Sequence, residues 1–227
     1  RSQVGFVEDI LCDRAFLEDR GNSALEIATL SDLAEIGVLT PHLMANAAAA
    51  TAMARSAGVD PADIREAIRN FRLDAHRIEL VAEAGGVRWI DDSKATNPHA
   101  ADASLASFES VVWIVGGLLK GVDLTPLVER FKGKLRGAIV IGVDQQPVLD
   151  AFAAVAPLVP VLAVEPGAVK SEQDAERVMQ TVATQAKSWA VEGDVVLLAP
   201  AAASMDQFAD YAHRGKVFAK AAAWVNR

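Results

Sequence analysis

The chain has 227 residues, 52% of them apolar, which is enough for one large domain or for a domain and part of a second. Its formal charge of −8 argues against a nucleic-acid partner, because such binding depends on lysine and arginine side chains that neutralise phosphates. No apolar run approaches the roughly 18 residues of a membrane span, and the single Cys12 excludes an internal disulfide. These features predict a soluble, cytoplasmic protein.

Residues 1 to about 40 are predicted to form short strands joined by turns. The stretches VGFVEDILC, RAFLED and ALEIATL are each rich in apolar residues, and Arg20-Gly21-Asn22 indicates a turn between the last two. This part of the chain is therefore expected to contain three short strands.

Two helices are predicted to follow. An alanine-rich helix begins at about Leu43 and ends at Gly58, and a second begins at Asp60-Pro61 and carries an apolar face as far as Phe71. Alanine at many positions allows helices to pack closely, so this segment is interpreted as structural.

The remainder of the chain alternates between strands and helices. A hairpin is predicted around Gly85-Gly86, followed by the β-branched runs SVVWIVGG, GAIVIGV, LVPVLAV and DVVLLAP. Such continuous apolar runs are typical of parallel strands buried on both faces. Ser171 and Asp174 have capping-box spacing at the start of a helix that runs to Ala190. The pattern predicts an α/β fold with a Rossmann-like, doubly wound, mostly parallel sheet, preceded by a boundary near residues 71–76.

The loop IDDSKATNPHAAD follows the second strand of the hairpin. Asn97 is expected to cap a helix whose first residue is Pro98. Capping does not explain the polar residues that precede this cap, which are Asp92, Ser93, Lys94 and Thr96. Because ligands of α/β proteins bind outside the carboxyl ends of the strands, this cluster is predicted to contact a ligand.

Two other strand ends carry candidate binding groups. In VGGLLKG the paired glycines allow close backbone approach and Lys120 offers a cation, although Gly-Gly after a strand also forms ordinary tight turns. Ser204 and Gln207 have capping-box spacing, which predicts a helix start able to bind an anion, with Tyr211 two turns further on. Capping alone could explain Ser204, and packing could explain Tyr211. Together with Lys94, these groups predict a site for an acidic small molecule at one sheet edge.

Several other kinds of site are not indicated. The sequence contains no G-x-G-x-x-G after a strand, no P-loop and no serine- or cysteine-based triad spacing. Its four histidines have no metal-ligand spacing; they are His42, His76, His99 and His213. The residues alone therefore predict an α/β domain that binds an anion, without a metal site.

Three stretches resemble the C-terminal domain of the Mur ligase family, in its D-glutamate-adding branch. They are HRIELVAEAGGVRWIDDSKATNP, VGGLLKG and LLAPAAASMDQFADYAHRGKVF. The resemblance covers nearly the whole chain and is strongest over residues 76–120 and 195–218. DSKATN is its specific part, because sister ligases typically carry tyrosine-histidine or serine-tyrosine-asparagine versions of that loop. The Asp-Asn-Pro-Arg motif of the diaminopimelate-adding member is absent.

The resemblance implies an ATP-dependent acid–D-amino-acid ligase of cytoplasmic peptidoglycan synthesis, serving cell-wall biogenesis, cell shape and division. Such an enzyme adds D-glutamate to UDP-N-acetylmuramoyl-L-alanine through an acyl phosphate, with ATP and Mg²⁺, and is expected to be a monomer. Residues 1–71 would be the end of the central ATP-binding domain and residues 72–227 the amino-acid-binding domain. Because the chain starts without Met and has no P-loop, it is expected to be a fragment that is inactive alone, with most magnesium ligands outside it.

The same resemblance assigns roles residue by residue. Positions that match the ATP site are Asn46, Arg77 and Asp92. Positions that match the D-glutamate site are Lys94, Thr96, Ser204 and Tyr211, and the catalytic positions are Lys94 and Lys120.

The chain departs from the family pattern at a few positions. Leu118 stands where an aspartate is common, Leu43 where an asparagine is common, Tyr211 where phenylalanine is frequent and Ala202 where cysteine is frequent. With Leu118, the Gly-Gly loop has no acidic group beside Lys120. Two alternatives stay open: another Mur or folylpolyglutamate-type ligase, and a non-catalytic α/β module that binds an acidic metabolite.

Overall fold

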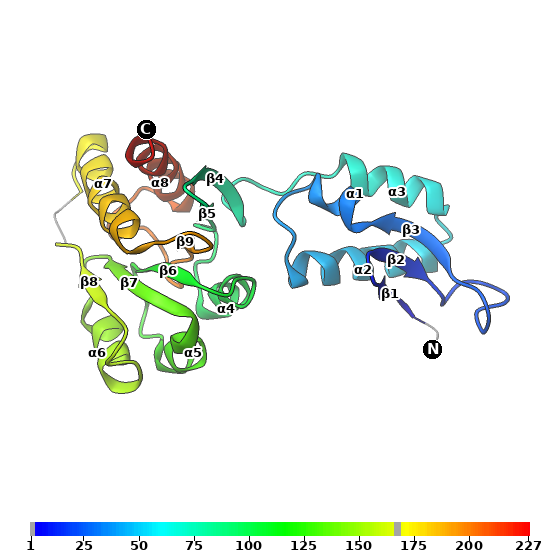
Figure 1. The fold of residues 1–227 in the computed structure, drawn as a ribbon, viewed down its shortest axis with the longest axis horizontal. Coiled ribbons are helices and arrows are strands. Elements are labelled where there is room, and N and C mark those ends of the chain that lie inside the picture. Colours follow the sequence, from blue (N-terminus) through cyan, green and yellow to red (C-terminus); the bar gives the residue numbers. More distant parts are fainter. Residues whose placement is uncertain (1–2, 166–168) are drawn as a thin grey trace. The chain divides into compact units, whose positions relative to one another are not determined.

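The computed structural model describes residues 3–165 and 169–227, which form two compact units (Figure 1). The division falls between Asp74 and Ala75. No helix among these residues is long and apolar enough to cross a membrane. All four tryptophans of the chain lie in the second unit, so their fluorescence reports on that unit alone.

The first unit packs helices on a three-stranded antiparallel sheet of order β1-β2-β3. Its elements are β1 (Val4–Val7), β2 (Ile10–Asp13), β3 (Leu25–Thr29), α1 (Leu30–Ala34), α2 (Pro41–Ser56) and α3 (Pro61–Asn70). Both predicted helices are present, and each starts with proline after a capping side chain, Thr40 for α2 and Asp60 for α3. Leu11, Ile27 and Ile64 belong to the apolar core.

Two strand predictions for the first unit were wrong. VGFVEDILC forms two strands, because the chain reverses at Glu8, whose φ of +55° places it in the left-handed region. RAFLED is not a strand: the Asp13 carboxylate accepts hydrogen bonds from the backbone N–H groups of Ala15 and Phe16, at 2.8 and 3.0 Å, and turns the chain out of β2.

The second unit is built on a six-stranded sheet of order β4-β5-β9-β6-β7-β8. Its strands are β4 (Glu79–Ala84), β5 (Val87–Asp91), β6 (Val111–Gly116), β7 (Leu135–Ile141), β8 (Val161–Ala163) and β9 (Val195–Leu198). The predicted hairpin joins β4 and β5 in antiparallel pairing, with Gly85 and Gly86 both at positive φ, and every other pairing is parallel. The doubly wound α/β prediction is confirmed.

Helices cover both faces of this sheet (Figure 1). One face carries α4 (Pro98–Ala106), α5 (Thr125–Phe131) with the 3-10 turn η1 (Lys132–Lys134), and α6 (Gln146–Val155); the other carries α7 (Glu172–Trp189) and α8 (Tyr211–Val225). The predicted caps are present, since Ser171 accepts from the N–H of Asp174 and Asn97 from that of Ala100. Every residue of β6 is buried, as expected for a strand covered on both faces.

The position of β9 decides where a ligand can bind. It lies between β5 and β6, and its outgoing loop leads to α8 on one face, whereas the loops after β5 and β6 lead to α4 and α5 on the other. Neighbouring loops that diverge in this way open a crevice at the carboxyl edge of the sheet, the usual ligand site of such folds.

The helix start predicted at Ser204 was wrong. Residues 205–207 form a turn in which the Ser204 carbonyl accepts from the N–H groups of Gln207 and Phe208, and α8 begins only at Tyr211 with Asp210 as its cap. Tyr211 is therefore the first residue of the helix, not a residue two turns inside it.

Gly137 in β7 provides a test of how tightly α7 packs on the sheet. A Cβ atom at this position would lie 2.6 Å from Cε3 of Trp189. We expect Gly137→Ala to lower the free energy of unfolding by about 1–3 kcal/mol, because the half-buried ring, which packs against the core, must shift. Urea unfolding followed by tryptophan fluorescence measures this change.

Gly133→Ala is the matched control, since a Cβ there meets no atom within 4 Å. Equal stability losses for the two variants would contradict the packing of Trp189 on β7.

The buried Asp32 of α1 makes the first unit sensitive to acid. Burial alone would raise its pKa, but hydrogen bonds from Thr29 and Arg69 lower it to about 2. A carboxyl with a lowered pKa in the folded state stabilises the fold above its unfolded pKa of roughly 3.9, and loses this contribution as the pH falls through 2. Asp32→Asn should therefore cost up to about 2 kcal/mol at pH 7 and progressively less toward pH 2.

Urea unfolding of the first unit, followed through the methyl resonances of Ile27 and Leu33 at several pH values, measures this loss. Glu66→Gln, an exposed change on α3, is the control and should show no such pH dependence. A pH-independent cost for Asp32→Asn would show that the ionised carboxylate is not what stabilises α1.

Candidate functional site

The loops after β5, β9 and β6 are joined by backbone hydrogen bonds into one surface. The N–H of Ala201 donates to the carbonyl of Ala95 at 3.0 Å. Leu118 and Ala203 exchange two hydrogen bonds, at 2.8 and 3.3 Å, and form an isolated antiparallel bridge. The topology thus brings to one sheet edge the three loops that carry Lys94, Ser204 and Lys120.

Lys94 lies against the first residue of α8. Its Nζ is 5.8 Å from the centroid of the Tyr211 ring, close enough for a cation–π contact. The His76 ring meets the same tyrosine edge-to-face, with centroids 6.4 Å apart. Tyr211 is 36% exposed, and Lys94 and Thr96 are each half-buried. Cationic and aromatic groups therefore face solvent together at this edge.

Lys120 lies beside a separate cavity of about 830 Å³. Its lining includes Gly117, Leu118, Lys120, Val143 and Asp206. Lys94 is not among the lining residues, so the two predicted catalytic lysines share a sheet edge but not this cavity.

The paired glycines before Lys120 are required by the protein's own backbone. A Cβ at Gly116 would lie 2.2 Å from the carbonyl oxygen of Ile141, and one at Gly117 would lie 2.4 Å from that of Ala203. Both residues also have positive φ, at +112° and +127°. The glycines let this loop pass between its neighbours, which accounts for them without a ligand.

Asp92 is turned inward rather than toward solvent. It is 5% exposed, its carboxylate accepts from the N–H of Ile78 at 3.3 Å, and the Ser104 hydroxyl donates to its other oxygen. Burial, and then the charge of Asp91, raise the pKa of Asp92. Of the other positions matched to the ATP site, Arg77 is exposed just before β4 and Asn46 is exposed on α2 of the first unit.

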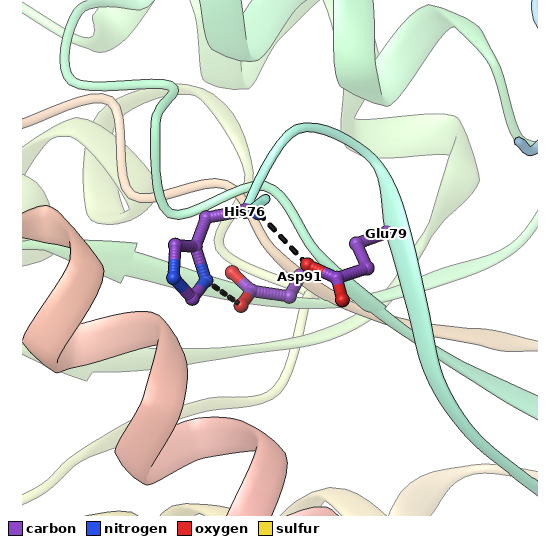
Figure 2. Close-up of side chains that lie close together, drawn as sticks. All are labelled: His76, Glu79 and Asp91. Atoms are coloured by element: carbon purple, nitrogen blue, oxygen red, sulfur yellow. Dashed lines mark hydrogen bonds and ion pairs between the residues drawn. The ribbon is translucent and has the colours of Figure 1, made fainter. Parts of the chain in front are cut away.

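His76, Glu79 and Asp91 form a cluster that the sequence did not reveal (Figure 2). His76 Nδ1 lies 2.6 Å from Asp91 Oδ2, and the backbone N–H of His76 donates to Glu79 at 2.8 Å. Burial raises the pKa of Asp91, against the lowering effect of its hydrogen bond with His76. The φ of His76 is +64°, so these contacts hold the backbone in a left-handed conformation.

One imidazole nitrogen and two carboxylates are a donor set that suits a divalent cation, and their atoms lie within 4.8 Å of one another. A metal bound through Nδ1 of His76 would have to displace the hydrogen bond that joins this atom to Asp91. The arrangement therefore fits a structural role better than a metal site. We call the pair of His76 and Asp91 the anchor, because it holds the start of the second unit against β5. In the sequence, these residues are marked only by their neighbours. His76 directly precedes Arg77 and Asp91 directly precedes Asp92, and both of those neighbours were predicted site residues.

Arg214 is another residue that sequence reasoning missed. It is completely buried in the first turn of α8 and donates hydrogen bonds to Ser93 and Ala202, in the loops after β5 and β9. The glycine that follows it in YAHRGKVF is the local signal, because glycine inside a helix indicates that the helix packs closely against a neighbour at that point.

The family model described as "Mur ligase, glutamate ligase domain" matches residues 76–202, more than half of the chain. The chain belongs to the Mur ligase family. The match includes Arg77, Asp92, Lys94 and Lys120, and it ends before Ser204 and Tyr211.

Curated Mur ligases align with nearly the whole chain. It is 55% identical over 217 residues to a UDP-N-acetylmuramoylalanine–D-glutamate ligase of Leifsonia xyli subsp. xyli, covering 96% of the chain and 41% of that protein. The ligase of the same name from Streptomyces avermitilis is 49% identical over 220 residues, covering 97% of the chain and 45% of that protein. The chain thus spans less than half the length of these relatives.

Among solved structures, UDP-N-acetylmuramate-alanine ligase MurC from Thermotoga maritima matches with a TM-score of 0.52 and 18% identity. The match covers 81% of the chain and 38% of that protein. At this identity the likeness supports the Mur ligase fold alone.

Gly215 tests the packing of α8 against the anchor in this Mur ligase chain. A Cβ there would lie 2.3 Å from His76 Nδ1 and 2.5 Å from Asp91 Oδ2. We expect Gly215→Ala to separate the pair and to lower the free energy of unfolding by about 1–3 kcal/mol. NMR of the His76 ring and urea unfolding followed by tryptophan fluorescence measure the two effects.

Gly133→Ala again serves as the control. An unchanged His76 ring signal in Gly215→Ala would mean that α8 does not press on the histidine.

Proposed function

We propose that this chain carries the D-glutamate-binding domain of a ligase that joins D-glutamate to UDP-N-acetylmuramoyl-L-alanine. The observation that carries the proposal is the high identity, 55% and 49% over nearly the whole chain, to ligases named for D-glutamate. The cations at one sheet edge, the half-buried Lys94 and the exposed Lys120, support it, because a dicarboxylate is bound by cations and hydrogen-bond donors. The reaction would serve cytoplasmic peptidoglycan precursor synthesis.

In the proposed reaction, the substrate carboxylate takes the γ-phosphoryl group of ATP and releases ADP. The D-glutamate amine then attacks the acyl phosphate and expels inorganic phosphate as the amide bond forms. Residues of this chain would hold the attacking amino acid: Lys94 and Thr96 on its carboxylates, with Lys120 and Tyr211 beside them. Holding the nucleophile in place lowers the entropic part of the barrier.

Ser204 needs a different role from the one expected. It is 3% exposed and does not begin a helix, so no helix N-terminus there can attract a carboxylate. We propose that Ser204 contributes by shaping the loop between β9 and α8.

For ATP, we propose a nucleotide-contacting role for the exposed Arg77 in the second unit and, separately, for the exposed Asn46 in the first unit. The buried Asp92 would position the segment next to Arg77, because its carboxylate is engaged by Ile78 and Ser104. Magnesium would neutralise phosphate charge when bound with ATP. The cluster of His76, Glu79 and Asp91 fits this ion poorly, since its nitrogen is engaged and Mg²⁺ prefers oxygen ligands, so we assign it no role there.

Titration of the chain with D-glutamate, followed by backbone amide NMR, tests the proposal. We expect shifts at residues 94–96, 120 and 211 with D-glutamate, and none with L-glutamate or meso-diaminopimelate. Lys94→Ala should weaken D-glutamate binding by about tenfold or more, because it removes a charge-assisted contact. Lys132→Ala should leave binding unchanged, because this lysine lies in η1 and pairs with Glu129 of α5.

Shifts with meso-diaminopimelate instead would assign the chain to a sister ligase. Equal binding of D- and L-glutamate would contradict a stereospecific ligase and favour a module that binds acidic metabolites.

A further inference from the structure

A buried arginine lies beneath the carboxyl edge of the sheet. Arg214 is 0% exposed, although arginine is among the residue types least often fully buried. Burial lowers its pKa to about 10, so the guanidinium still carries its charge at neutral pH. A residue of this kind needs a reason beyond filling space, because a buried charge is costly to desolvate.

The guanidinium ties two strand-end loops together. Its Nε donates to Oγ of Ser93 and its Nη2 to the Ser93 carbonyl, both at 2.9 Å. Nη1 and Nη2 both donate to the carbonyl of Ala202 at 3.2 Å. Ser93 directly precedes Lys94, and Ala202 lies two residues before Ser204. One rigid fork therefore sets the spacing between the loops after β5 and β9.

The third loop packs against the same group. A Cβ at Gly117 would lie 3.4 Å from Nη1 of Arg214, so the loop that leads to Lys120 passes next to the guanidinium. Arg214 thus adjoins all three loops of the candidate site, and it reaches them from α8, the helix whose first residue is Tyr211.

The positive charge of Arg214 is only partly balanced. Within the described residues, its hydrogen bonds all go to neutral oxygens, and the nearby acids that act on it, Asp206 and Asp91, form no ion pair with it. A cation in a low-dielectric interior acts over a longer range than one in water. It therefore favours a negatively charged ligand at the edge above it.

We propose that Arg214 is a positioning residue for an acidic amino acid: it fixes the loops that carry Lys94, Ser204 and Lys120, and adds a buried positive charge beneath them. The proposal rests on the proposed function, since D-glutamate is the ligand it assigns to this edge. Arg214 itself is covered by the loops and does not touch the ligand.

Arg214→Lys tests this role, because lysine keeps the charge but cannot donate to Ser93 and Ala202 through a planar fork. In NMR titrations with D-glutamate, we expect the affinity to fall by about tenfold or more. Hydrogen exchange at the amides of Lys94, Ala201 and Ala203 should become faster, since the loops lose their common tie. Both measurements are made where tryptophan fluorescence shows the variant fully folded.

The matched control is Arg136→Lys, at an arginine that pairs with Asp194 at the opposite, amino-terminal edge of the same sheet. It should change D-glutamate affinity less than twofold and leave exchange in the site loops unaltered. If Arg214→Lys does not fold, Ser93→Ala removes one acceptor of the fork and should show the same two changes at smaller size.

An arginine with a merely structural role would accelerate exchange throughout the second unit and leave the affinity of the folded molecule unchanged, which would overturn the proposal. Affinity within twofold of the wild type would also overturn it. If the wild-type chain does not bind D-glutamate, the proposed function fails, and exchange alone then decides. In that case selective acceleration in the site loops supports Arg214 as their positioning residue, and uniform or unchanged exchange refutes it.

Discussion

The pairing of β9 between β5 and β6 is the constraint on which the candidate site depends. These three neighbours run parallel, so their carboxyl ends meet at one edge even though β9 follows β6 by nearly eighty residues in the sequence. Without that insertion, Lys94 and Ser204 would belong to unrelated parts of the surface. Backbone hydrogen bonds also join the loops that follow these strands, such as the bond from the N–H of Ala201 to the carbonyl of Ala95.

Beneath this edge lies a layer of buried polar groups instead of a purely apolar core. Asp91, Asp92 and Arg214 are each at most 5% exposed, and burial shifts each pKa toward the neutral form of the group. Partners offset that cost: His76 for Asp91, Ser104 for Asp92, and Ser93 for Arg214. Each of these bonds joins the end of β5, or the loop that follows it, to another segment of the second unit, so these buried polar groups help to fix the geometry of this sheet edge.

Much of the fold could be predicted from the sequence because its signals are local. The β-branched runs predicted the parallel strands, Gly85-Gly86 predicted the hairpin, and Ser171 and Asn97 predicted helix caps that the structure contains. Local signals also misled where two competed. Ser204 and Asp210 both have side chains that can cap a helix. The chain forms a turn after Ser204, and Asp210 caps α8 instead.

The interior of the site could not be predicted, since its bonds join residues far apart in the chain. Ser93 and Arg214 are separated by 121 positions, and the sequence around either residue gives no indication that the two are in contact. The resemblance to known ligases identified Lys94, Lys120 and Tyr211 as candidates for contact with a ligand. It gave no indication of His76 or Arg214, whose contacts lie within the protein and become visible only in three dimensions.

The crowding at Gly116 and Gly117 also limits how this loop can change over evolutionary time. Neither position can accept a side chain without moving the backbone of a neighbouring loop or strand. Leu118, by contrast, joins Ala203 through backbone atoms alone, and its side chain is 41% exposed. The side chain at this position can therefore change without disturbing the backbone contacts of the loop. Variation there can retune the lining of the adjacent cavity while Lys120 stays in place.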